Sequence, residues 1–286
     1  MKKLLALVLA AGMVFSMTAC GSTSDTVSDA SSAGTEDSAG SAEAEETSSD
    51  SDSDLAYITE KGTLVVGVTD FEPMDYLDED GNWIGFDADM ATAFAESLGV
   101  KVEFVEIDWD NKILELNNKS IDCVWNGMTL TDEVTSSMEC SNAYSSNSQV
   151  VVLSADVADQ YTDLDSLADL TFAVESGSAG EAAAEDNGLS YTSVSSQASA
   201  LMEIAAGTSD AAIIDLLMAE AMVGEGTSYD NLTTGLVLVD EEYGVGFRQG
   251  SDLVTLLNEF FEQSYDDGTM TEIAAEYGIE DSIIAQ

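Results

Sequence analysis

The sequence predicts an α/β fold in which strands alternate with helices. Short apolar runs rich in β-branched residues recur along residues 55–286, and segments with apolar residues at helical spacing lie between them. The alternation occurs in two sets, before and after about residue 153, which indicates two lobes built on mainly parallel sheets. In such sheets ligands bind outside the carboxyl ends of the strands.

The first set of elements contains four predicted strands. They are expected at residues 63–69, 102–107, 121–126 and 148–153. Asp87 is expected to cap a helix that buries Met90 and Phe94 and stops at Gly99, and Asn111 is expected to cap a shorter helix.

The second set repeats the alternation and ends in two closing helices. Strands are expected at residues 171–175, 210–215 and 236–239, and helices after Ser178, over 197–206 and after Asp215. The closing helices are predicted from apolar residues at helical spacing. These residues are Leu253, Leu256, Leu257, Phe260 and Phe261, then Met270, Ile273 and Tyr277.

The N-terminus predicts an export signal. Lys2 and Lys3 precede an apolar run, residues 4–15, that is too short to span a bilayer, and residues 16–19 lead to Cys20. We interpret residues 1–20 as a lipoprotein signal peptide that ends at a lipidated Cys20, which would anchor the protein to the outer face of the cell membrane. The alternative is an ordinary secreted protein in which Cys20 is incidental.

Residues 21–54 predict a disordered tether. The segment consists almost entirely of Ser, Thr, Gly, Ala, Asp and Glu, with no aromatic residue, Lys or Arg. Such a composition has little to bury and its charges repel one another.

Charge and composition exclude several classes of function. The chain carries 56 acidic and 7 basic residues, for a net charge of −49. Nucleic acid is therefore an unsuitable partner, because binding it requires basic residues. The absence of histidine removes the commonest metal ligand and general base, and no cofactor is expected. Beyond Cys20, Cys123 and Cys140 predict two free thiols rather than one disulfide, although both remain open.

Five segments of the sequence carry a family resemblance. In order they are GTLVVGVTD (62–70), GFDADMA (85–91), IDCVWNGMTLT (121–131), ESGS (175–178) and DAAIID (210–215). This series resembles the polar amino-acid substrate-binding proteins of ABC importers, the bacterial extracellular solute-binding proteins of family 3. The resemblance implies a two-lobed periplasmic-binding-protein-like fold of type II. Lobe one would comprise residues 55–150 and 244–286, lobe two residues 151–243, with a hinge near 150–153 and 243–247.

The resemblance also implies a set of ligand-binding residues in a cleft between the lobes. It places Asp70 and Phe71 in a pocket wall, Trp109 at the pocket mouth and Ser178 at a helix start that favours an anion. Asp215 would pair with the ammonium group of the ligand. The strand-end residues Asn126, Gly127 and Thr129 would offer hydrogen bonds to its carboxylate and amine.

Several of these residues also have structural interpretations. Asp70 has a possible role in loop bonding, Trp109 in core packing and Ser178 as a helix N-cap, while Asp215 is compatible with a solvent-facing strand end.

One departure from the family pattern concerns charge. Val134 stands where the family has an arginine that grips the ligand carboxylate. Arg248, the only arginine, is expected at the surface, and Lys112 is a possible substitute although a solvated helix position is expected. Asp70, Glu175 and Asp215 would make an acidic cleft, which suits a cationic solute and disfavours a dicarboxylate such as glutamate.

The resemblance implies a binding protein and not an enzyme. We expect a monomer that captures an amino acid or related small amine and delivers it to an ABC permease with ATPase subunits. The alternatives are a solute-sensing partner of a membrane receptor and a cyclohexadienyl-dehydratase-like enzyme on the same fold.

Overall fold

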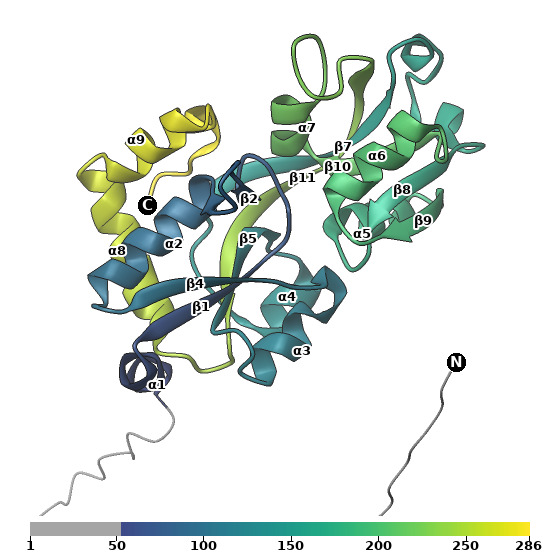
Figure 1. Cartoon of the computed structure of the whole chain (residues 1–286). Helices are drawn as coiled ribbons and strands as arrows, with labels where there is room; N and C mark the ends of the chain where they lie inside the picture. Colours follow the sequence, from purple (N-terminus) through teal and green to yellow (C-terminus); the bar gives the residue numbers. More distant parts are fainter. Residues whose placement is uncertain (1–52) are drawn as a thin grey trace, which may run out of the picture. The chain divides into compact units, whose positions relative to one another are not determined.

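The computed structural model describes residues 53–286 (Figure 1). Cys20, the signal peptide and residues 21–52 of the predicted tether lie outside this range. The strands are β1 (Thr63–Val68), β2 (Tyr76–Leu77), β3 (Trp83–Ile84), β4 (Lys101–Glu106), β5 (Cys123–Thr129), β6 (Glu139–Cys140), β7 (Ser145–Ser154), β8 (Thr171–Glu175), β9 (Ser190–Val194), β10 (Ala211–Asp215) and β11 (Leu232–Phe247). The α-helices are α1 (Asp54–Lys61), α2 (Phe86–Ser97), α3 (Lys112–Asn117), α4 (Asp132–Ser137), α5 (Ala179–Asp186), α6 (Gln197–Ala206), α7 (Leu216–Met222), α8 (Leu253–Asp266) and α9 (Thr269–Glu276).

Most strands belong to one hydrogen-bonded order, β4-β1-β5-β11-β7-β10-β8-β9, with β6 on β11. Strands β4, β1 and β5 are parallel to one another, as are β10, β8 and β9. The antiparallel strands β7 and β11 lie between these two groups (Figure 1). β11 pairs with β5, β7 pairs with β10, and β7 and β11 pair with each other, so the sheet order alone assigns no lobe boundary. The predicted lobes, residues 55–150 with 244–286 and residues 151–243, therefore stay a prediction.

The predicted elements agree best with the structure where the apolar residues of a segment are regularly spaced. β8 and α6 have the predicted bounds, while the separate segments 236–239 and 243–247 form one strand, β11. The edge strand β9 was not predicted, because its sequence SYTSV is polar and none of its residues is buried. The helices α1 and α4 were also missed.

Asp87 does not cap α2, contrary to the prediction. The N-cap position is Gly85, at φ 125°, and Asp87 lies in the first turn with its carboxylate in the core. There it accepts hydrogen bonds from the Gly127 backbone N–H at 2.6 Å and the Tyr144 hydroxyl at 2.7 Å. Burial raises the pKa of Asp87 to about 7 despite these bonds. Asn111 precedes α3 but makes no side-chain cap.

The two cysteines within residues 53–286, Cys123 and Cys140, are free thiols, as the sequence favoured. Cys123 is fully buried in β5, and Cys140 in β6 is half-buried. Burial raises the pKa of Cys123 well above its ordinary value and that of Cys140 to about 11, so neither thiol ionises near neutral pH.

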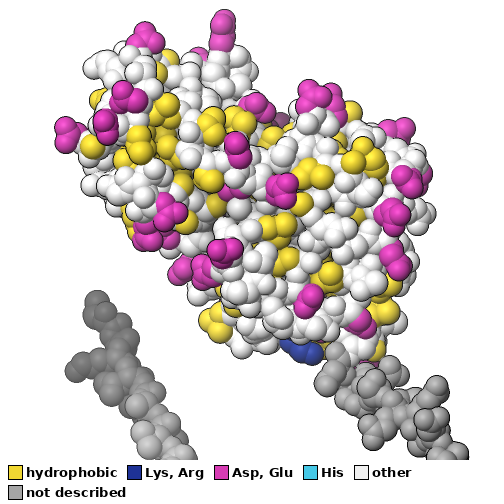
Figure 2. Space-filling view, turned by 180° about the vertical axis from the view of Figure 1, so that it is seen from behind, with side chains coloured by type: hydrophobic (Ala, Val, Ile, Leu, Met, Phe, Trp, Pro, Cys, Tyr) yellow, Lys and Arg dark blue, Asp and Glu magenta, His cyan; other side chains and the backbone are white. Residues whose placement is uncertain are grey.

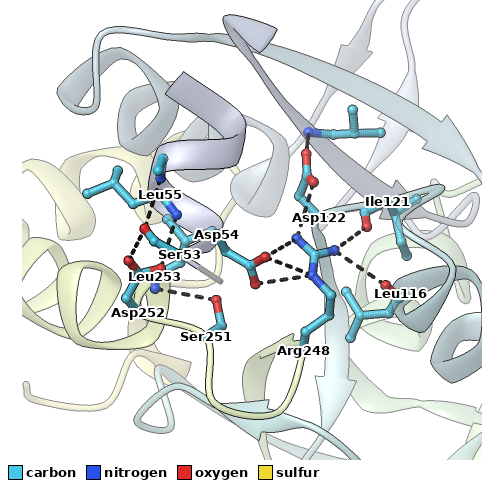
Figure 3. Close-up of polar contacts among 12 residues, drawn as sticks. Ser53, Asp54, Leu55, Leu116, Ile121, Asp122, Arg248, Ser251, Asp252 and Leu253 are labelled. Atoms are coloured by element: carbon cyan, nitrogen blue, oxygen red, sulfur yellow. Dashed lines mark hydrogen bonds and ion pairs between the residues drawn. The ribbon is translucent and has the colours of Figure 1, made fainter. Parts of the chain in front are cut away.

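Arg248 is buried, which corrects the expected surface position (Figure 3). Its Nε and Nη2 donate to the carboxylate of Asp54 at 2.8–3.1 Å, and Nη2 also reaches Asp122 at 3.4 Å. Nη1 donates to the backbone carbonyls of Leu116 and Ile121. The ion pair therefore joins the end of β11 to α1 and the start of β5.

Ser53 and Asp54 are part of the folded domain rather than of the tether. The Ser53 hydroxyl accepts a hydrogen bond from the Ala56 N–H at 3.0 Å and donates to Asp252 at 2.5 Å (Figure 3). Asp54 is only 5% exposed. Asp252 and Arg248, far along the chain, supply the partners that hold these two residues to the folded domain.

Acidic side chains far outnumber basic ones in the sequence, and the visible face of the described residues reflects this imbalance (Figure 2). On the face shown in Figure 2 acidic side chains are spread widely, and basic ones appear at one spot only. No helix within residues 53–286 is both long and apolar enough to cross a bilayer.

Candidate ligand-binding site

A cavity of about 210 Å³ lies at the carboxyl ends of β5, β8 and β10. This is the position that open α/β sheets use for ligands. Every predicted site residue lines it except Asp70. The predicted residues on its wall are Phe71, Trp109, Asn126, Gly127, Thr129, Glu175, Ser178 and Asp215.

Asp70 is exposed and lies outside the cavity lining, which corrects its predicted place. The loop after β1 closes tightly, since the Phe71 N–H donates to the Asp75 carbonyl at 2.7 Å. Phe71 is 2% exposed and packs edge-on against Tyr243. A side chain on Gly127 would lie 2.4 Å from the Phe71 ring, so glycine is required there. The loop thus gives the cavity its aromatic residue and leaves Asp70 outside.

Asp215 ends β10 and is surrounded by amide groups. It is 3% exposed and accepts hydrogen bonds from the side-chain N–H groups of Asn147 at 2.8 Å, of Gln197 at 2.5 Å and of Gln149. The Asn147 and Gln149 amides also donate to Glu241. No basic side chain within residues 53–286 pairs with Asp215. Burial, followed by the charge of Glu241, raises the pKa of Asp215 well above its ordinary value.

Glu175 ends β8, the strand next to β10, and is 2% exposed. Its Oε1 has no hydrogen-bond partner among residues 53–286. Burial raises the pKa of Glu175 to about 8, although the charge of Lys112 and the hydroxyl of Thr69 oppose the shift. The cavity therefore contains a carboxyl group without a partner for one of its oxygens.

Lys112 lines the cavity and is only 7% exposed, which corrects the expected solvated position. Its Nζ donates to the Gly177 carbonyl at 2.8 Å and the Trp109 carbonyl at 3.3 Å, and lies 4.9 Å from the centre of the Trp109 ring. Gly177, at φ 71°, approaches Asp110 so closely that an added Cβ would lie 2.8 Å from its Cα. Lys112 thus joins the segment before α3 to the turn after β8.

Asn126 and Gly127 are held by internal bonds rather than left free for a ligand. The Asn126 amide exchanges hydrogen bonds with Thr69 and donates to Asp75 at 2.8 Å, and the Gly127 N–H is bound to Asp87. Both residues line the cavity and position the loop after β1.

Ser178 is the N-cap of α5, the structural alternative considered for it. Its hydroxyl accepts a hydrogen bond from the Glu181 N–H at 3.1 Å. Val134, in the place expected for an arginine, is 4% exposed and lines the cavity. Trp109 packs in an apolar cluster, as its structural interpretation expected, and also lines the cavity, while its contact with a ligand stays a prediction.

Sequence reasoning missed Gln149 and Gln197. Both line the cavity and hold Asp215, yet Gln149 adjoins the apolar run 150–153 and Gln197 opens a helix. A polar residue beside an apolar run could have marked Gln149 as a candidate site residue. Its contact with Asp215, and that of Gln197, bring together β7, α6 and β10, which only the tertiary structure shows.

Residues 64–280 match the family described as bacterial extracellular solute-binding proteins, family 3. The chain belongs to this family. It is 30% identical over 286 residues to the arginine-binding extracellular protein ArtP of Bacillus subtilis, and the match covers 96% of both proteins.

Solved structures agree with this membership. A crystal structure of a mutant of ArgBP from T. maritima matches with a TM-score of 0.74 and 28% identity, over 78% of this chain and 98% of that one. The ancestral amino acid-binding protein AncCDT-1, a precursor of cyclohexadienyl dehydratase, matches with a TM-score of 0.72 and 30% identity, over 79% and 99%. The fold is the two-lobed type II periplasmic-binding-protein fold, and the family is one of binding proteins.

Proposed function

We propose that the protein is the amino-acid-binding component of an ABC importer and captures its solute in the cavity at β5, β8 and β10. The observation that carries the proposal is Asp215, a buried carboxylate on the cavity wall whose hydrogen-bond partners are neutral amides. The ammonium group of an amino acid supplies the positive charge that these amides lack. Relatives named as amino-acid-binding proteins support this assignment.

The size of the cavity supports a small solute. Its volume of about 210 Å³ is below the roughly 300–1,000 Å³ typical of sites for larger ligands. For the carboxylate of the solute, Lys112 is the only basic residue on the described cavity wall, and α5 points its N-terminal end there through Ser178 and Ala179.

The test is a thermal-shift screen of the purified full chain against the standard amino acids and small amines. A ligand that binds only the folded state raises the melting temperature. We expect at least one amino acid to do so in a concentration-dependent way. If no amino acid changes the melting temperature while an unrelated class of solute does, the proposed function is wrong.

The proposal includes attachment to the outer face of the membrane through a lipid on Cys20. A cysteine directly after an export signal supplies the thiol for such an anchor, and two acyl chains hold a protein stably where one does not. We expect the wild-type chain to fractionate with membranes and the Cys20→Ser variant to be released. Equal membrane association of both would contradict the anchor.

One observation supports an enzymatic alternative: the chain is similar to a precursor of cyclohexadienyl dehydratase. Glu175, with its raised pKa, is a buried carboxyl group able to donate a proton in an elimination. Incubation of the purified chain with prephenate distinguishes the two functions: a binding protein leaves prephenate unchanged beyond its spontaneous decay, whereas turnover that Glu175→Gln abolishes establishes the enzyme.

A further inference from the structure

We propose that Glu175 selects the side chain of the solute, and that the solute is an amino acid whose side chain ends in a cationic guanidinium or ammonium group. This inference deepens the proposed function and rests on it. Glu175 would accept hydrogen bonds from the cationic group, while Asp215 receives the ammonium group at the other end.

The charges on the cavity wall require a positively charged solute. The acidic residues that line it are the exposed Asp132 and Glu133 and the buried Glu175 and Asp215. Lys112 is the only basic residue on the wall among the described residues. A charge taken out of water is costly unless it is paired with an opposite charge. A solute with a neutral or acidic side chain would leave the buried Glu175 without a cationic partner.

Lys112 does not neutralise Glu175 directly. Two of its N–H groups donate to the carbonyls of Gly177 and Trp109, and its Nζ lies 4.9 Å from the centre of the Trp109 ring. The ion pairs found within residues 53–286 do not include Glu175, and its Oε1 is buried without a partner. Since an unpaired buried acceptor loses its water without gaining a bond, a donor on the solute would gain the most at this atom.

Two acidic groups in one cavity indicate two cationic groups on one solute. Glu175 and Asp215 end the adjacent parallel strands β8 and β10, and neighbouring strands lie about 4.8 Å apart. Asp215 has its own set of amide donors, whereas Glu175 has none on Oε1. An amino acid with a neutral side chain carries one ammonium group and would satisfy only one of the two carboxylates.

The carboxylate of the solute also has a partner in this arrangement. An ammonium group has three N–H donors, and two of those on Lys112 are used by Gly177 and Trp109. The third is available to a carboxylate oxygen. This distinguishes a cationic amino acid from the corresponding amine without a carboxylate.

Isothermal titration calorimetry of the purified full chain at pH 8.5 tests the inference with L-arginine and L-citrulline, which have nearly the same shape and differ in charge. We expect the wild type to bind arginine at least about tenfold more tightly than citrulline, as for a hydrogen bond to a charged group. Glu175→Gln should reduce this preference to below about threefold. Glu185→Gln removes an exposed charge outside the cavity and should leave it unchanged.

Three outcomes separate this inference from the proposed function. Equal affinity of the wild type for arginine and citrulline, or an unchanged preference in Glu175→Gln, overturns the role of Glu175. If both amino acids still bind in that case, the proposed function stands. Binding of agmatine, which lacks the carboxylate, as tightly as arginine overturns the assignment to an amino acid. Binding of no amino acid at all contradicts the proposed function itself.

The wild-type comparison needs no variant, so it decides the inference even if Glu175→Gln does not fold. Glu175→Asp offers a second variant, because it keeps the charge and shortens the side chain by one methylene group. It should retain a preference for arginine over citrulline, and complete loss of that preference in a folded Glu175→Asp protein would show that charge is not what selects the solute.

Discussion

Two of the buried acidic clusters within residues 53–286 are stabilised in opposite ways. In the Arg248 cluster, defined here as Asp54, Asp122, Arg248 and Lys61, each carboxylate has a cationic partner. All the N–H groups of the Arg248 guanidinium donate hydrogen bonds (Figure 3). The Lys61 ammonium contacts Asp122 at 2.5 Å. Its charges are compensated within the chain, so its role is structural.

In the cavity cluster, defined as Glu175 and Asp215, neither carboxylate has a cationic partner within residues 53–286. Amides hold Asp215, and one oxygen of Glu175 has no partner. Burial raises the pKa of both groups, and the charge of Lys112 opposes only part of the shift at Glu175. A buried carboxylate that lacks a cation and also lines a cavity marks a place where a ligand can supply one, whereas Asp87, which does not line this cavity, is held in the core by hydrogen bonds alone.

The largest expected effect is on the Arg248 cluster. Arg248→Met leaves Asp54 and Asp122 buried with less compensation, and breaking a buried ion pair by removing one partner costs about 3–5 kcal/mol. We expect urea unfolding to show a loss of this size. Lys101→Met, which removes an exposed charge, should change stability by no more than about 0.5 kcal/mol. A loss below about 1 kcal/mol in Arg248→Met would contradict the structural role.

The second prediction concerns the cavity cluster. Asp215→Asn keeps the volume of the side chain and should weaken binding of an amino acid by about 1.5–3 kcal/mol, because it removes the charge from the hydrogen bond to the ammonium group. Calorimetry with an amino acid found by the thermal-shift screen measures the effect. Asp186→Asn, at an exposed helix end, is the matched control. Unchanged affinity in Asp215→Asn would remove Asp215 from the site.

The third prediction uses the raised pKa of Glu175, about 8 in the folded protein against 4.5 ordinarily. The folded state holds this proton more tightly than the unfolded state, so stability is favoured at low pH and falls as pH rises from about 4.5 to 8. Without ligand, the wild type should lose at least about 1.4 kcal/mol relative to Glu175→Gln between pH 5 and pH 8. Parallel pH profiles of the two proteins in urea would disprove it.

The smallest effect is expected at Asp70. It is exposed and does not line the cavity, so Asp70→Asn should change the affinity for an amino acid by no more than about 0.5 kcal/mol. Calorimetry beside Asp215→Asn provides the comparison. A loss as large as that of Asp215→Asn would show that the loop after β1 moves Asp70 to the ligand.

The sequence by itself determined the alternation of strands and helices and the family. Strands such as β8 and helices such as α6 follow from the spacing of their own apolar residues, which is local information. The placement of Trp109, Glu175 and Asp215 at one cavity also followed from the sequence, because the family pattern puts them at strand ends and in the turns that follow.

Only the tertiary structure decided how each charge is compensated. Arg248 lies 194 residues from Asp54, and Gln149 lies 66 residues from Asp215, so no local pattern relates them. The sequence therefore suggested a surface role for Arg248, a solvated position for Lys112 and a capping role for Asp87, whereas burial and distant partners decided otherwise. The physical reason is that the burial of a side chain and its hydrogen-bond partners depend on which distant segments the sheet brings together. The hydrophobic periodicity of a sequence describes only the segment in which a residue lies.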